Sequence, residues 1–210
     1  MCNERKGKNI SNLICRRVDR SSKTMAKKNK ASIAAPTVLK PFKKNDDSLV
    51  QVVIETPKGC RNKYKFDPEL RSFKLSRVLP DGMLFPYDFG FIPSTLAEDD
   101  DPIDVLLIMD TPAFPGCVIE SRLIGVIEGE QNEDGETTRN DRLLAVSVRS
   151  HQHSDLKDVS DINPKLLKEL GQFFVNYHRQ DKVKFKVLGT KGPKEAERLL
   201  AEAIKRGNAA

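Results

Sequence analysis

The sequence predicts a mainly β protein with α-helices, in which short strands form a small barrel that two helices cover. Six short segments rich in β-branched and apolar residues follow one another between residues 49 and 148. The stretches between them carry the Pro, Gly and Asp residues typical of chain reversals. After residue 160 the apolar residues change to helical spacing. Many short strands joined by regular turns are typical of a small barrel.

The six predicted strands account for most of the chain between residues 49 and 148. We expect them over residues 49–55, 62–66, 73–78, 103–109, 118–127 and 142–148. Turn signals separate them, namely Pro57-Lys58-Gly59, Asp67-Pro68, Pro80-Asp81-Gly82, Pro115-Gly116 and Glu133-Asp134-Gly135.

Two helices are expected to follow the strands. Asn163 can cap the first, and Pro164 fits its first turn. One face of this helix carries Leu166, Leu167, Leu170, Phe173, Phe174 and Tyr177. The second helix opens at Pro193 and has an apolar stripe of Ala196, Leu199, Leu200, Ala203 and Ile204. Each stripe has to be buried, so we expect both helices to cover the barrel.

A chain of 210 residues suits one domain with a tail. Residues 1–44 hold 13 Lys and Arg against two acidic residues, a net charge of +11, which leaves −5 for the rest. We expect 1–44 to be a disordered basic tail and 45–210 to be the folded domain. Met25 is an alternative start, and an organelle transit peptide is a further interpretation. Because the tail carries the excess positive charge, the pI of about 9.1 does not predict specific nucleic-acid recognition by the domain.

The sequence also predicts a soluble protein of the cytoplasm. The longest apolar runs, such as residues 105–109, are far too short to span a membrane. Four cysteines, Cys2, Cys15, Cys60 and Cys117, form no C-x-x-C pair and have no histidine at zinc-ligand spacing. We expect reduced thiols, as in a reducing compartment.

Five carboxylates lie within the seven residues 98–104, directly before an apolar strand. Carboxylates this close repel one another unless a cation is present, and Mg²⁺ prefers oxygen ligands. A calcium loop of the helix-loop-helix kind is excluded, because Asp104 occupies the sixth position, where glycine is required, and a strand follows. A charged surface turn remains the ordinary alternative.

Basic residues could serve such a site. Lys63 and Lys65 share one face of their predicted strand. Arg77 continues the face of Phe73 and Leu75, so alternation places it on the buried side, where it needs an anion or a structural salt bridge.

Two further side chains are candidates. Tyr177 lies on the apolar stripe of the first helix, so its hydroxyl needs an internal partner, either in a site or at a backbone carbonyl. Glu55 ends the first strand and could hold a metal-linked water or simply flank a turn. The sequence contains no glycine-rich phosphate loop, and no nucleophile lies in a recognisable triad.

The order of several motifs resembles that of the soluble inorganic pyrophosphatases of the first family, in a divergent bacterial-type branch. The resemblance spans roughly residues 49–177, and its most specific part is the D-x-D-P-x-D core. The matching runs are Val52-Val53-Ile54-Glu55, Asn62-Lys63-Tyr64, Phe85-Pro86-Tyr87-Asp88-Phe89-Gly90-Phe91-Ile92-Pro93 and Asp99-Asp100-Asp101-Pro102-Ile103-Asp104-Val105.

The resemblance implies a five-stranded, OB-like closed barrel and Mg²⁺-dependent hydrolysis of inorganic diphosphate to two orthophosphates. By position, Asp99 and Asp104 match metal ligands and Asp101 matches the carboxylate that helps to deprotonate water. Glu55 would act through metal-linked water. A homo-oligomer is also implied.

The resemblance further assigns phosphate-binding positions to Lys63, Arg77 and Tyr177. Arg142 stands where the family carries a lysine, and it too is expected to bind phosphate.

Five further positions depart from the family pattern. Lys65 replaces a glutamate, Phe85 and Phe89 replace tyrosines, and His178 replaces a lysine. Asn140 falls where a second metal-binding aspartate is expected.

Asp141 or Asp134 could take the place of the missing aspartate through a shifted loop. Two other functions stay open. One is hydrolysis of another small phosphoanhydride or phosphate ester, and the other is a polyanion-binding module on the same barrel.

Overall fold

The computed structural model describes residues 35–209 of the chain. The predicted tail as far as residue 34, with the alternative start at Met25, lies outside the described residues. The described elements are η1 (Pro36–Val38), β1 (Phe42–Lys43), β2 (Asp46–Thr56), β3 (Asn62–Asp67), β4 (Ser72–Val78), β5 (Asp88–Phe91), β6 (Asp104–Ile108), β7 (Val118–Glu133), β8 (Glu136–Arg139), β9 (Arg142–Ser147), η2 (Val159–Asp161), α3 (Pro164–Arg179), β10 (Lys184–Lys191) and α4 (Pro193–Gly207).

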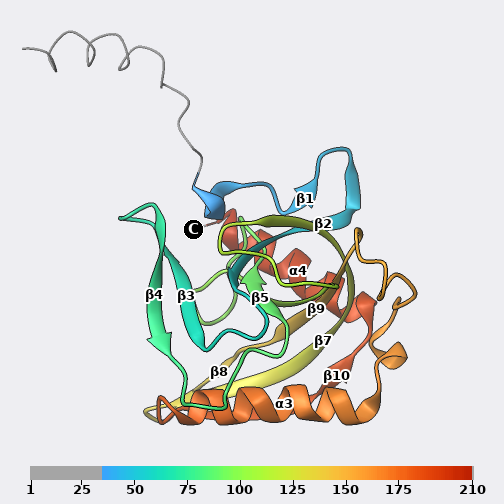
Figure 1. The fold of residues 1–210 in the computed structure, drawn as a ribbon. Helices are drawn as coiled ribbons and strands as arrows, with labels where there is room; N and C mark the ends of the chain where they lie inside the picture. Colours follow the sequence, from blue (N-terminus) through green and yellow to red (C-terminus); the bar gives the residue numbers. More distant parts are fainter. Residues whose placement is uncertain (1–34, 210) are drawn as a thin grey trace, which may run out of the picture. The chain divides into compact units, whose positions relative to one another are not determined.

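Five strands of the main sheet close into a ring, which confirms the predicted fold class (Figure 1). The order is β2, β5, β6, β9 and β7, and β7 pairs back to β2. β6 and β9 run parallel, whereas the other pairs of the ring are antiparallel. β1, β8 and β10 extend the sheet beyond the ring.

Alternate residues of the ring pack into two apolar clusters, as the period of two in a strand requires. On β6, Val105 and Leu107 belong to the cluster that includes α4, whereas Leu106 and Ile108 belong to the cluster that includes α3. Both predicted helices are therefore present and bury their stripes against strands (Figure 1). As expected, the Asn163 side chain caps α3, accepting a hydrogen bond from the backbone N–H of Lys165 at 2.9 Å.

The β3–β4 hairpin forms a separate two-stranded sheet at the side of the ring (Figure 1). This corrects the expected burial of the face that carries Phe73, Leu75 and Arg77. Leu75 is 52% exposed, because no second layer covers β4 at that point. Arg77 is only half-buried and finds its partners on α3 and just beyond it.

Gly90 allows β5 to lie close to β2 beneath the acidic loop. A Cβ atom at this position would come within 1.9 Å of the carbonyl oxygen of Val53. Because glycine has no side chain, β5 can pair closely with β2, which carries Glu55, while its other edge pairs with β6, which begins at Asp104. In residues 35–209, no helix combines the length and the apolar character needed to cross a membrane.

Candidate active site

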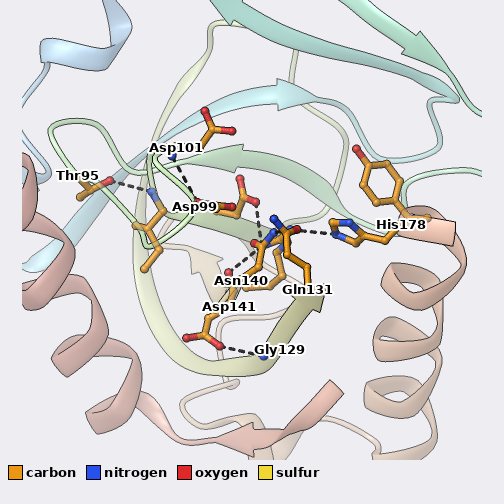
Figure 2. A network of polar contacts seen from close by, with 12 residues as sticks. Thr95, Asp99, Asp101, Gly129, Gln131, Asn140, Asp141 and His178 are labelled. Atoms are coloured by element: carbon orange, nitrogen blue, oxygen red, sulfur yellow. Dashed lines mark hydrogen bonds and ion pairs between the residues drawn. The ribbon is translucent and has the colours of Figure 1, made fainter. Parts of the chain in front are cut away.

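The acidic loop between β5 and β6 is fixed by short-range hydrogen bonds. The Thr95 hydroxyl accepts from the backbone N–H of Ile103 at 3.0 Å and donates to the carbonyl of Ile92 at 2.6 Å. The backbone N–H of Ala97 donates to the carbonyl of Asp101 at 2.8 Å. These bonds hold the loop so that Asp104 begins β6, as Figure 2 shows in part.

Four of the predicted site residues line one cavity of about 340 Å³. They are Glu55 from β2, Lys63 from β3, and Asp101 and Asp104 from the acidic loop. Lys65 of β3 lines the same cavity. The structure thus brings together carboxylates and lysines that lie far apart in the sequence.

Asp99 lies next to this cavity, and its carboxylate accepts from the backbone N–H of Asp101 at 3.4 Å (Figure 2). Arg77, Tyr177 and Arg142 are not among the residues that line it. They are connected to it through Lys63 and Asp104, as described below.

The surroundings of the site disfavour the ionised forms of its carboxylates. Burial raises the pKa of Glu55 to about 7, with a smaller contribution from the charge of Asp104, although the hydrogen bond from the Phe66 backbone acts in the opposite direction. Burial, followed by the charge of Asp104, raises the pKa of Asp99 to about 6. Burial also raises the pKa of Asp104, against the effect of Arg142. A divalent cation would relieve this concentration of negative charge.

These acidic side chains suit a hard divalent ion such as Mg²⁺, because they offer carboxylate oxygens as ligands. Within residues 35–209, however, no three His, Cys, Asp or Glu side chains are grouped closely enough to hold a metal ion as they stand. Two of the carboxylates instead contact basic side chains, Lys65 and Arg142.

Lys65 forms a two-oxygen ion pair with Asp101. Its Nζ lies 2.9 Å from Oδ1 and 2.8 Å from Oδ2. Burial lowers the pKa of Lys65, but the hydrogen bond and charge of Asp101 raise it by more, so its net pKa lies above the ordinary value.

Arg142 is buried, and its guanidinium forms an ion pair with Asp104. Its Nη1 lies 3.1 Å from Oδ2 of Asp104, donates to the backbone carbonyl of Asp141 at 3.0 Å, and also donates to Asn140 Oδ1. Its Nε is buried and has no hydrogen-bond partner within the described residues. The contacts of Arg142 are therefore directed mainly at Asp104 and its surroundings.

Arg77 and Tyr177 form a second pair. Nη2 of Arg77 donates to the Tyr177 hydroxyl at 2.6 Å, and Nη1 contacts Asp181. The internal partner that Tyr177 requires is therefore an arginine rather than a backbone carbonyl. Lys63 faces Arg77 across the β3–β4 hairpin, and its Nζ lies 5.3 Å from the centre of the Tyr177 ring.

The position of the missing aspartate is not refilled by Asp141 or Asp134. Asp141 accepts from the backbone N–H of Gly129 at 2.9 Å and pairs with Arg139, so it points away from Asp99 and Asp101 (Figure 2). Asp134 lies at the exposed turn between β7 and β8, with a φ of 52°.

Asn140 is buried and donates to the side chain of Gln131 at 2.6 Å (Figure 2). Sequence reasoning missed this role for Gln131, because the strand was expected to end at residue 127 and the structure extends it to Glu133.

His178 is buried and uncharged. Burial, reinforced by the positive charges of Arg142, Lys63 and Arg77, lowers the pKa of His178 to about 3. Its ring stacks on Phe185 at 4.6 Å, and its Nε2 lies 3.4 Å from Nη2 of Arg142. His178 therefore supplies no positive charge in place of the expected lysine.

Phe85 and Phe89, which stand where tyrosines are expected, are both buried in the apolar cluster beneath the site. Their rings lie 5.4 Å apart. Neither side chain can form the hydrogen bond that a tyrosine hydroxyl would offer, and the ring of Phe89 contacts a site residue, Lys63.

The raised pKa of Glu55 predicts a pH-dependent stability. Between its ordinary value of 4.5 and about 7, the folded state binds more protons than the unfolded state, so the free energy of unfolding falls as pH rises. Through Glu55 alone, we expect the free energy of unfolding to fall by about 3 kcal/mol over this range of pH. Urea denaturation at pH 5 and pH 8 measures this change, and Glu55→Gln should reduce it. If the unfolding free energy of Glu55→Gln depends on pH as strongly as that of the wild type, the raised pKa of Glu55 is not the cause.

Both the sequence and the fold of this chain are similar to those of known proteins. Residues 52–208 match the family model described as inorganic pyrophosphatase. An inorganic pyrophosphatase from a Synechocystis species is 40% identical over 157 residues, which cover 75% of this chain and 90% of that protein. One from Geobacillus stearothermophilus is 36% identical over 163 residues, which cover 78% and 96% of the respective chains.

Solved structures agree with these sequence matches. The crystal structure of inorganic pyrophosphatase from Thermus thermophilus has a TM-score of 0.75 at 32% identity, covering 83% of this chain and 99% of that one. The structure from Neisseria gonorrhoeae has a TM-score of 0.74 at 31% identity, with the same coverage.

Proposed function

The chain belongs to the inorganic pyrophosphatase family, and from this we propose that it hydrolyses inorganic diphosphate to two orthophosphates with Mg²⁺ as its divalent ion. The observation that carries this proposal is the cavity that joins Glu55, Asp101 and Asp104 to Lys63. Carboxylates there can hold a cation, and a lysine beside them can hold the phosphates that the cation also binds.

We assign the metal-binding role to Asp99 and Asp104. When bound, Mg²⁺ would make a water molecule more acidic and offset negative charge on the phosphates. Asp101 would accept the proton of the attacking water. Glu55 would act through a water molecule linked to the metal.

Lys63, Arg77 and Tyr177 are the proposed phosphate ligands. Within the described chain, Lys63 Nζ forms no hydrogen bond or ion pair, so its charge is available to an anion. It lies over the rings of Phe89 and Tyr177, which direct it without using its hydrogen-bond donors. The guanidinium carbon of Arg77 lies 4.4 Å from the centre of the Tyr177 ring.

Arg142 stays a predicted phosphate ligand, although its contacts support a positioning role as well. It holds the Asp104 carboxylate while its own side chain is only 4% exposed. In that role it would set the direction of the metal-binding oxygen.

Tyr177→Phe is expected to raise KM for diphosphate by roughly tenfold with little change in kcat, because Arg77 loses the hydroxyl that orients it. Initial rates at saturating magnesium over a range of diphosphate concentrations measure this split. Tyr87→Phe is the matched control, since Tyr87 is partly buried outside the cavity and contacts Lys58 through its ring. If both variants behave alike, Tyr177 does not act through Arg77.

Competition between substrates tests the proposed function. Orthophosphate release from diphosphate, triphosphate and a nucleoside triphosphate should be compared at equal free magnesium. We expect strong preference for diphosphate, because the cavity is small and, of the described residues, only Lys63 and Lys65 bring positive charge to its lining. Equal or faster release from triphosphate would favour the broader phosphoanhydride hydrolase.

We also propose a homo-oligomer in the cytoplasm. Leu75, Val78 and Leu84, on or just after β4, are each about half exposed, which supports a covered surface in an assembly. Cys60 and Cys117 are free, which supports a reducing compartment. Light scattering of the purified protein measures the assembly, and a monomer at micromolar concentration would contradict it.

A further inference from the structure

Lys65 is the side chain in the cavity whose charge opposes the expected pattern. Its ammonium contacts both oxygens of Asp101, at 2.9 and 2.8 Å, although the lysine side chain remains 47% exposed. Glu55 and Asp104 line the same cavity. A single ammonium thus occupies the face of the carboxylate that a cation would use.

We infer that Lys65 is a tethered cation that is held by Asp101 and opposes the loading of a divalent ion at the neighbouring carboxylates of the cavity. The inference deepens the proposed function, since it concerns how that site is loaded. An ammonium is a compact point charge on a flexible stem, and an ion pair this exposed contributes little to stability. Lys65 can therefore leave Asp101 at small cost, and while it is bound its charge lowers the affinity of the neighbouring carboxylates for another cation.

The contrast with Arg142 supports an exchangeable role for Lys65. Arg142 is buried and is held by Asn140 and the backbone carbonyl of Asp141 as well as by Asp104. Lys65 has no comparable support, because Asp101 is its only hydrogen-bonding partner within the described residues. One cation of the site is thus fixed and the other can be displaced.

Lys65 also affects when Asp101 can act. While both of its oxygens accept from the ammonium, Asp101 is less free to accept a hydrogen bond from water. Displacement of Lys65 would free these oxygens when the site is loaded. Without substrate, we therefore expect the protein to bind divalent ions more weakly than a variant that lacks the Lys65 ammonium.

Binding of Mn²⁺ alone to the full chain, followed by the electron paramagnetic resonance signal of the free ion, tests the inference. Mn²⁺ is suitable because it takes the same oxygen ligands as Mg²⁺. Lys65→Met is expected to lower the Kd about fivefold or more, since one nearby positive charge is removed. Lys65→Arg keeps the charge and should bind as the wild type does.

Lys74→Met is the matched control. Lys74 lies directly opposite Lys65 in the β3–β4 hairpin, pairs with Asp67, and does not line the cavity. Its removal should change the Kd by less than about twofold. Thermal unfolding of each variant shows whether the fold is kept.

Unchanged or weaker Mn²⁺ binding in Lys65→Met would overturn the inference, as would equally tight binding in Lys65→Arg and Lys65→Met. The assay contains no substrate, so its outcome is separate from that of the proposed function. Phosphate release with unchanged Mn²⁺ binding would remove the inference alone. Tighter binding without any release would remove the proposed function alone.

Discussion

Asp104→Asn is expected to lower the rate of diphosphate hydrolysis by more than about 100-fold, a larger loss than removal of an outer-shell partner of a metal ligand usually causes. The variant replaces a charged oxygen with a neutral amide in the proposed metal site. Its fold should persist at lower stability, because Arg142 loses its charged partner but keeps its contacts with Asn140 and the backbone carbonyl of Asp141. Orthophosphate release and circular dichroism measure the two expectations.

Asp100→Asn is the matched control in the same loop. Asp100 is exposed and has a φ of 63°, a conformation that asparagine tolerates well. The same chemical change there should leave the rate within about twofold of the wild type, as expected for a surface substitution. Equal losses in the two variants would mean that the charge of the whole loop matters, and not the position of Asp104.

Arg142→Met is expected to cause the largest loss of stability among the site variants. Asp104 would remain mostly buried without its cation, and Asn140 would lose its donor. Removal of one partner of a buried ion pair costs about 3 kcal/mol or more. For a domain of this size, such a loss lowers Tm by roughly 10 °C. Scanning calorimetry at neutral pH measures it.

Arg198→Met provides the comparison for this second prediction. Arg198 forms ion pairs with Glu195 and Glu202 on the exposed face of α4, with its side chain 52% exposed. Exposed pairs of this kind contribute little to stability. If Arg142→Met and Arg198→Met lower Tm equally, the contact between Arg142 and Asp104 is not a buried pair of consequence.

Strand positions with strong apolar patterns could be predicted from the sequence, whereas strands that depend on a partner could not. Residues 142–148 carry a continuous apolar run and form β9 almost as expected. β5 has only four residues, lies between prolines and contains Gly90, so it resembles a loop until β2 and β6 pair with it. β10 is an edge strand with exposed lysines, and only its pairing with β7 defines it.

The carboxylates of the site were predictable because they are concentrated in one loop, and the cavity does join Asp101 and Asp104 to Glu55. Their partners were not. Lys65 and Asp101 are 36 positions apart, and their contact depends on how the β3–β4 hairpin leans over the loop. Likewise, the family resemblance assigned Arg142 to phosphate binding, but only the fold places it against Asp104.

Release of orthophosphate from magnesium diphosphate by the purified full chain, with and without a chelator, tests the central claim most directly. The account predicts release that stops when the chelator removes the divalent ion and resumes when magnesium is restored. Release that continues in excess chelator, or no release at any magnesium concentration, would contradict it.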